Sequence, residues 1–239
     1  MRVGLLSDVH ANAVALAAVL ADLPPVAALV CAGDVVGYGP HPAECVEALR
    51  EWTPDARVAD GSDGGSEPGP AEEPLVSVRG NHDRVLAAGA SFGGGMAGAG
   101  LEHARNELTD EQVAWLAALP ETRRAFGGRV RVAHGHPADP DRYVYPDLFS
   151  ADLLGDERVL VLGHTHVQGV RRFPTGLVVN PGSVGQPRDG DPRAAYAVLD
   201  LDRERVDLRR VAYDVDAVER AVRDADLPDA IAGRLRRGR

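Results

Sequence analysis

Five short apolar segments of this chain each end in a polar motif rich in Asp, Asn or His, and this recurrence limits the fold more than any other feature. The motifs in chain order are SDVH at 7–10, GD at 33–34, GNHD at 80–83, HG at 134–135 and GHTH at 163–166. Strand-like and helical patterns alternate around the first motifs, which is the order typical of an α/β fold. These are strands at 2–7 and 26–32 and helices at 13–22 and 42–51. Because ligands bind where the strands of such sheets end, we expect all five loops to meet at one rim.

The remainder of the chain contains one long interruption and a strand-rich second half. Residues 54–74 carry six acidic residues, one arginine and abundant Gly and Pro, so we expect a flexible acidic insertion. The strand after it continues the same pattern, which predicts a single domain over 1–239 whose tail, 214–239, forms two short helices broken at Pro228. The other expected elements are a helical region at 99–118, a short helix at 146–154, and strands at 75–78, 121–126, 129–133, 158–162, 168–173, 176–180, 194–200 and 205–211.

The net charge of −10 and the composition exclude some classes of partner. An acidic chain lacks the clustered basic residues of an extended nucleic-acid footprint, although a small nucleotide is compatible with it. No apolar run approaches the roughly 18 residues of a membrane span, so we expect no membrane-spanning segment. The first residues, MRVGLLSDVH, are typical of a core strand rather than a secretory signal, and a cytoplasmic protein is therefore expected. The sequence leaves a homo-oligomer open.

The side chains that would meet at the rim form a chemically specific set. They are Asp8, His10, Asp34, Asn81, His82, His134, His164 and His166. Seven of them could supply oxygen or nitrogen ligands, which is enough for two divalent ions if one carboxylate bridges. The motifs offer no sulfur, and mixed imidazole and carboxylate ligands suit manganese, iron, zinc, cobalt or nickel. Two ions about 3.5–4 Å apart would stabilise both oxygens of a displacement at phosphorus and turn a shared water into hydroxide.

The motif RGNHDR at 79–84 also offers a proton donor for the leaving group. His82 is the expected general acid, because an imidazole titrates near neutral pH. Asp83 beside it would fix the tautomer of His82 and raise its pKa, so both are candidate catalytic residues. The alternative for Asp83 is a structural role as a helix cap for the residues that follow it. The flanking arginines favour an anionic substrate.

In this order, the five motifs resemble those of the calcineurin-like metallophosphoesterases, and the resemblance runs from residue 1 to about residue 190. Three longer stretches are similar to a prokaryotic subgroup of small phosphodiesterases. These are SDVHAN at 7–12, GDVVGYGPHP at 33–42 and NPGSVGQPRDGDP at 180–192. The resemblance implies a four-layer α/β/β/α sandwich, in which two mixed sheets are flanked by helices.

The resemblance also implies a role for each motif residue. The first ion would be held by Asp8, His10 and His166, the second by Asn81, His134 and His164, and Asp34 would bridge them. An Arg or Asn is implied at the phosphate, for which Arg188, also counted as catalytic, and Asn12 are the candidates. His136, two residues after a motif histidine, is a further candidate for the substrate site. Manganese is the expected ion, with iron, nickel, cobalt and zinc as alternatives.

We therefore expect a dinuclear metal-dependent phosphoesterase, and a phosphodiesterase is the favoured interpretation. In this mechanism, metal-bound hydroxide attacks a small-molecule or nucleotide ester and His82 acts as general acid. A nuclease, a dinucleoside-polyphosphate hydrolase and a phosphoprotein phosphatase are alternatives, because the same site serves all of them. A third class is a catalytically silent protein-binding scaffold. That class predicts damaged metal ligands, and here none of the motif ligands is missing.

Overall fold

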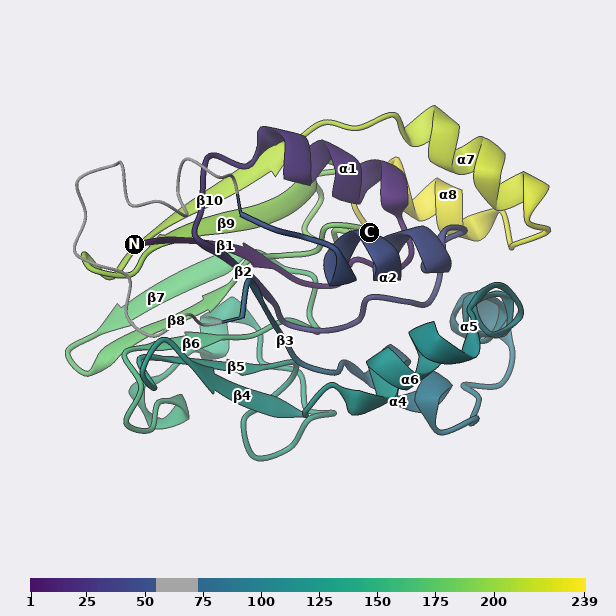
Figure 1. Cartoon of the computed structure of the whole chain (residues 1–239). Helices are drawn as coiled ribbons and strands as arrows, with labels where there is room; N and C mark the ends of the chain where they lie inside the picture. The colour runs from purple at the N-terminus through teal and green to yellow at the C-terminus, as the bar shows by residue number, and fades with distance from the viewer. Residues whose placement is uncertain (55–72) are drawn as a thin grey trace.

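Two five-stranded mixed sheets form the centre of the protein in a computed structural model, which describes residues 1–54 and 73–239 (Figure 1). The insertion expected at 54–74 lies almost entirely outside these described residues. The expected architecture of two mixed sheets with flanking helices is confirmed. Within the described part of the chain, no helix combines the length and the apolar character needed to cross a membrane.

The first sheet combines three parallel strands from the start of the chain with a hairpin from its end, in the order β10-β9-β1-β2-β3. Its strands are β1 (Arg2–Leu6), β2 (Ala28–Cys31), β3 (Leu75–Ser77), β9 (Ala194–Asp200) and β10 (Arg205–Val211). Parallel pairing of β1 with β2 and of β2 with β3 brings their carboxyl ends to one edge. The motif loops at 7–10, 33–34 and 80–83 all leave the sheet at that edge.

The second sheet has the order β4-β5-β6-β8-β7, with parallel pairing from β5 through β6 to β8. Its strands are β4 (Thr122–Ala125), β5 (Val130–Ala133), β6 (Val159–Val161), β7 (Gly169–Phe173) and β8 (Gly176–Asn180). The edge strands β4 and β7 pair antiparallel with their neighbours. The loops after β5 and β6 carry the two remaining motifs.

An apolar layer between the sheets holds them face to face. Val3 and Leu5 of β1 lie in one buried cluster with Val132 of β5 and Val161 of β6. Leu6, the next residue of β1, belongs instead to the cluster under the helices. This alternation follows from the two-residue period of a strand, whose successive side chains point to opposite faces.

In the described part of the chain, five helices share one apolar cluster with the outer face of the first sheet. They are α1 (Ala13–Asp22), α2 (Pro42–Arg50), α4 (Asn81–Ala87), α5 (Gly95–Glu107) and α6 (Asp110–Ala118). The helical region expected at 99–118 is therefore divided in two. The division lies at a reciprocal cap, in which Thr109 and Gln112 each accept a hydrogen bond from the other's backbone N–H, at 3.1 and 3.2 Å.

The outer face of the second sheet has a thinner cover. The short helix expected at 146–154 is instead two 3₁₀ turns, η1 (Pro146–Leu148) and η2 (Ala151–Leu153), with Phe149 buried beneath them. The two helices expected in the tail are present as α7 (Val215–Asp224) and α8 (Ala230–Leu235). They form a small apolar cluster of their own, against which Val14 of α1 and Met96 of α5 pack (Figure 1).

Candidate metal centre

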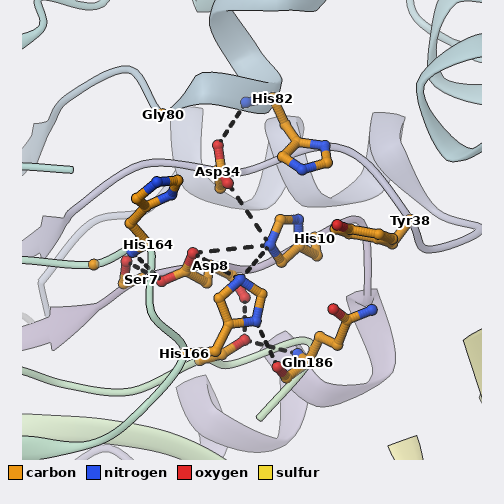
Figure 2. Close-up of polar contacts among 12 residues, drawn as sticks. Ser7, Asp8, His10, Asp34, Tyr38, Gly80, His82, His164, His166 and Gln186 are labelled. Atoms are coloured by element: carbon orange, nitrogen blue, oxygen red, sulfur yellow. Dashed lines mark hydrogen bonds and ion pairs between the residues drawn. The ribbon is translucent and has the colours of Figure 1, made fainter. Parts of the chain in front are cut away.

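All eight side chains expected at the rim lie close together, although they come from five separate loops. Three groups have ligand atoms within 4.8 Å of one another: Asp8, His10 and His166; His10, Asp34 and His82; and Asp34, His134 and His164. Asn81 joins them through its side-chain oxygen, which lies 3.1 Å from Nε2 of His134. Figure 2 shows Asp8, Asp34 and His166 around His10, with His82 on one side of the group and His164 on the other.

Backbone hydrogen bonds join the loops to one another. The N–H of Asp8 donates to Gly33 O at 2.9 Å, and that of His10 donates to Asp34 O at 3.0 Å. Glycine permits the close approach at Gly80, where a Cβ atom would lie 2.1 Å from Oδ1 of Asp34. The glycines beside the motif residues therefore let neighbouring loops touch through their backbones.

Four of the five histidine rings in the cluster are oriented by a hydrogen bond to a backbone carbonyl on the side away from the centre. Nδ1 donates to a backbone carbonyl in His10, His134 and His166, at 3.1, 2.7 and 2.6 Å. A carbonyl can only accept, so Nδ1 carries a proton in all three rings, and whenever such a ring is neutral its lone pair lies on Nε2. His164 uses the opposite nitrogen, because its Nε2 donates to Asp141 O at 3.2 Å. Such outward hydrogen bonds are typical of metal-binding histidines.

Each carboxylate has one oxygen held by the protein and one that faces the rings. Oδ2 of Asp8 accepts from Ser7 Oγ at 2.7 Å and from the His164 backbone at 3.1 Å. Its Oδ1 is buried and accepts no hydrogen bond among the described residues, although it lies 3.2 Å from Nε2 of His166. Asp34 likewise accepts from His82 N on Oδ1 at 2.8 Å, while Oδ2 lies 3.3 Å from His134 Nε2.

These unpaired atoms fit a pair of cations. Nε2 of His10 and Nε2 of His166 lie 3.0 Å apart and both present lone pairs, an arrangement that repels unless a positive charge lies between them. Burial would raise the pKa of Asp34, but the nearby charge of His134 holds it well below its usual range. Burial would lower the pKa of His134, but the charge of Asp34 raises it to about 10. Asp34 is therefore ionised and attracts positive charge, which a proton on His134 supplies without a metal and which a bound cation would supply in its place.

Backbone strain is concentrated in the same loops. A positive φ is uncommon outside glycine, and each such residue costs about 1–3 kcal/mol. Seven non-glycine residues around the cluster have positive φ: Asp8, His10, Ala11, Asp34, Tyr38, His164 and His166. This conformation turns side chains from successive positions of one loop toward the same rim. Strain of this kind is a common property of functional sites.

His82 faces the cluster, as expected, but its surroundings differ from the expectation. Its ring centroid lies 5.0 Å from that of His10, and its Nδ1 is buried without a hydrogen-bond partner among the described residues. Burial lowers the pKa of His82 to about 4, against the opposing charge of Asp34. The imidazole is therefore neutral at pH 7 until a further negative charge approaches it.

Asp83 does not orient His82, and that expectation is wrong. Its carboxylate accepts only from backbone N–H groups, namely those of Val35 and Val36 at 2.9 and 3.2 Å and that of Gly80 at 3.0 Å. Asp83 is the third residue of α4 and caps its first turn, so the alternative role as a helix cap describes it. It also fixes the loop that follows Asp34.

Asn12 does not reach the rim, which corrects its expected role in substrate binding. Its side chain is buried and caps α1, where Oδ1 accepts from Ala15 N at 3.1 Å. Its Nδ2 donates to Gly185 O at 3.0 Å. Both ends of the amide are therefore used in joining α1 to the loop before β9.

His136 is likewise not brought into the cluster. Its Nδ1 accepts from Ala138 N at 3.1 Å, within a tight turn that begins at His136. Arg188, in contrast, lies beside the cluster. Its guanidinium donates to Gln186 Oε1 at 2.7 and 3.2 Å and lies 5.7 Å from the centre of the Tyr38 ring.

Sequence reasoning missed the aromatic residues around the cluster and the residue that holds Arg188. Tyr38 packs against both His10 and His82, with ring centroids 4.9 and 4.7 Å away. Gln186 is buried; its carbonyl accepts from His166 and its side chain from Arg188, so it connects the two. The only sequence signal was their place inside the long stretches at 33–42 and 180–192.

A two-sheet sandwich with a buried Asp, Asn and His cluster at its strand ends is the architecture of a metal-dependent phosphoester hydrolase. The chain belongs to the calcineurin-like phosphoesterase superfamily, whose domain model matches residues 1–204. The resemblance expected from the motifs is thus confirmed, and the protein is a hydrolase of phosphoric esters.

Similar proteins cover nearly the whole chain. A crystal structure of a metallophosphoesterase from Sphaerobacter thermophilus has a TM-score of 0.81 and 33% identity, over 100% of this chain and 99% of that chain. Protein PH1004 from Pyrococcus horikoshii has a TM-score of 0.79 at 21% identity, over 100% and 98% of the two chains, and shows the shared fold. Phosphodiesterase YfcE from Escherichia coli is 29% identical over 84% of this chain and 89% of its own length.

Proposed function

We propose that the protein is a dinuclear metal-dependent phosphodiesterase. The observation that carries the proposal is the position of Asp34 in the buried cluster. Asp34 shares one group of potential ligands with His134 and His164 and another with His10 and His82, and His10 also belongs to the group of Asp8 and His166. A carboxylate common to both groups is what two adjacent ions need as a bridge. The similarity to a phosphodiesterase of Escherichia coli over 84% of the chain supports a diester as the substrate.

The proposed ligand sets follow the geometry of the cluster. Asp8, His10 and His166 would hold one ion, Asn81, His134 and His164 the other, and Asp34 would bridge them. When bound, the two ions would lower the pKa of a water at the site and neutralise charge on the phosphate. The donor chemistry suits manganese first, with iron, nickel, cobalt and zinc as alternatives.

His82 and Arg188 would act on the substrate itself. The neutral imidazole of His82 would take up a proton as the negative phosphate arrives, and then deliver it to the leaving oxygen. Arg188 is held by Gln186 and lies near His82, whose pKa its charge helps to lower. Its guanidinium would contact the phosphate oxygens as a planar donor.

Nuclease, dinucleoside-polyphosphate hydrolase and phosphoprotein phosphatase activities use the same ligand set, but no contact in the cluster favours one of them. A silent scaffold is disfavoured by the complete ligand set and by the strain in the loops that carry it. A cytoplasmic location, a single domain over 1–239 and a homo-oligomer also remain proposals. Cell fractionation, limited proteolysis and sedimentation would test them in turn.

Metal analysis combined with turnover tests the function directly. We expect the purified protein to bind two equivalents of Mn²⁺ and to hydrolyse bis(p-nitrophenyl) phosphate, in a panel that also includes Ni²⁺, Zn²⁺ and Mg²⁺. Asp34→Asn should lose both bound metal and turnover. The matched control is Asp216→Asn, since the side chain of Asp216 is 65% exposed and pairs with Arg236 in the tail helices, outside the cluster. Turnover at background level with every ion would favour the scaffold instead.

A further inference from the structure

The exposed aromatic side chains of the protein gather beside the metal centre. Six large apolar side chains are exposed in the described chain, and three of these, Phe92, Tyr143 and Tyr145, are aromatic. None of the three belongs to a buried apolar cluster. Two of them contact histidines of the centre, and the third stacks on one of those two. Their position is therefore not explained by the stability of the core.

Phe92 lies against the proposed proton donor. Its ring centroid is 4.6 Å from that of His82, and the ring is 39% exposed. Tyr38 contacts the same histidine at 4.7 Å. Because the leaving oxygen must come within hydrogen-bond distance of His82, the group attached to that oxygen comes close to Phe92 and Tyr38.

Tyr143 lies against a proposed metal ligand in the other part of the cluster. Its ring is parallel to that of His164, at 3.9 Å between centroids and 14° between planes, and it is 45% exposed. Tyr145 stacks on it from behind at 6.0 Å. His82 and His164 share a ligand group with Asp34 but not with each other. A phosphate held at Asp34 therefore has an exposed ring on each of two sides.

We propose that Phe92 and Tyr143 form an aromatic subsite that selects phosphate esters carrying a planar aromatic group. An exposed ring that borders a reactive centre gains most from a flat partner, because stacking adds to the burial of apolar area. The inference rests on the proposed function, since it takes the phosphate to lie at the cluster. An aryl group and a nucleobase share this chemistry, and the test separates them.

Direct binding of non-hydrolysable or product ligands tests the subsite without depending on the reactivity of a leaving group. In calorimetric titrations of the Mn²⁺-loaded protein, phenylphosphonate should bind about threefold to tenfold more tightly than propylphosphonate. Adenosine 5′-monophosphate against ribose 5-phosphate is the second pair. A preference in the second pair alone would identify a nucleobase, and one in the first pair alone would identify an aryl group.

Phe92→Leu and Tyr143→Leu retain apolar bulk but remove the flat ring. Each variant is expected to bring the ratio of the two dissociation constants in a ligand pair closer to one. If only one variant loses the preference, the aromatic group of the ligand lies on the side of the substituted ring. Leu148→Ala is the control, because Leu148 is 59% exposed and takes no part in the ring contacts. Metal content and unfolding midpoint are measured for every variant to exclude indirect effects.

Two results would overturn the inference: no aromatic preference in either pair for the unmodified protein, or a preference that both leucine variants retain in full. Failure of the proposed function gives a different result. In that case bis(p-nitrophenyl) phosphate is not hydrolysed by the unmodified protein, whatever the binding titrations show.

Discussion

The layer between the two sheets and the rim at their strand ends differ in burial of charge and in backbone conformation, although their residues are only three positions apart in the chain. Leu5 and Val161 lie within strands, are fully buried and contact only an apolar cluster. Asp8 and His164, just after the same strands, have positive φ and belong to a cluster of buried charge. The apolar layer stabilises the fold, and this stability holds the residues of the rim in their strained, positive-φ conformation.

The comparison implies that substitutions in the rim should change chemistry without unfolding the protein. His82→Ala is the sharpest case, and the turnover rate should fall by about 10²–10⁴, the usual contribution of a proton donor. Bound metal should be retained, because His82 lies outside the proposed ligand sets. Rapid-quench or steady-state turnover with parallel metal analysis measures both effects.

His136→Ala is the matched control, since His136 hydrogen-bonds in its own turn rather than in the cluster. Its turnover should equal that of the unmodified protein. Loss of metal in His82→Ala would instead assign His82 to the metal ligands. The geometry permits this result, because the ligand atoms of His82, His10 and Asp34 lie within 4.8 Å of one another.

Truncation in the layer should have the opposite consequence. Leu5→Ala removes a fully buried side chain between the sheets and should lower the free energy of unfolding by about 2–5 kcal/mol. Turnover per folded molecule should stay unchanged. Chemical denaturation of the metal-free protein measures the effect, with Val170→Ala on β7, 42% exposed, as the control. A large loss of turnover in folded Leu5→Ala would show that the two regions are coupled.

The layer was predictable from the sequence because strand pattern and burial repeat along the chain. Apolar runs bounded by polar motifs located β1, β2, β5 and β6 to within one or two residues. The segment at 146–154 was not, since Pro146 and spaced apolar residues fit either a short helix or two 3₁₀ turns. Only the packing of Phe149 under both turns distinguishes them.

The cluster was predictable for a different reason, because the edge of a parallel sheet brings its loops together whatever their conformation. The hydrogen-bond partners of Asn12 and Asp83, in contrast, depend on details of backbone geometry that the pattern of apolar and polar residues does not predict. A cap signature was nevertheless present in both, with Asn12 one residue before a helical pattern and Asp83 three residues after Gly80. Phe92 and Tyr143 lie in loops without periodicity, where no pattern could place them.

Ser7 tests how far the rim depends on residues that do not touch the metal. Its hydroxyl holds Oδ2 of Asp8, which leaves Oδ1 directed at His166. Ser7→Ala should weaken Mn²⁺ binding by about 10–100-fold, the usual cost of losing a hydrogen bond to a metal ligand. Competition with a fluorescent chelator measures it. Ser77→Ala is a control, because Ser77 is similarly buried at the end of β3 and its hydroxyl donates to the carbonyl of Val78 rather than to a proposed metal ligand.

Asn12 marks the boundary between the two regions, and the smallest effect is expected there. Asn12→Ala removes the cap of α1 and should lower the free energy of unfolding by about 0.5–2 kcal/mol. Asn12→Asp keeps the capping oxygen and loses the donor to Gly185, so it should recover part of that stability. The KM for bis(p-nitrophenyl) phosphate should not change in either variant, because Asn12 is buried away from the rim. A rise in KM without loss of stability would instead assign Asn12 to the substrate site, and the N-terminus of α1 would then belong to the rim.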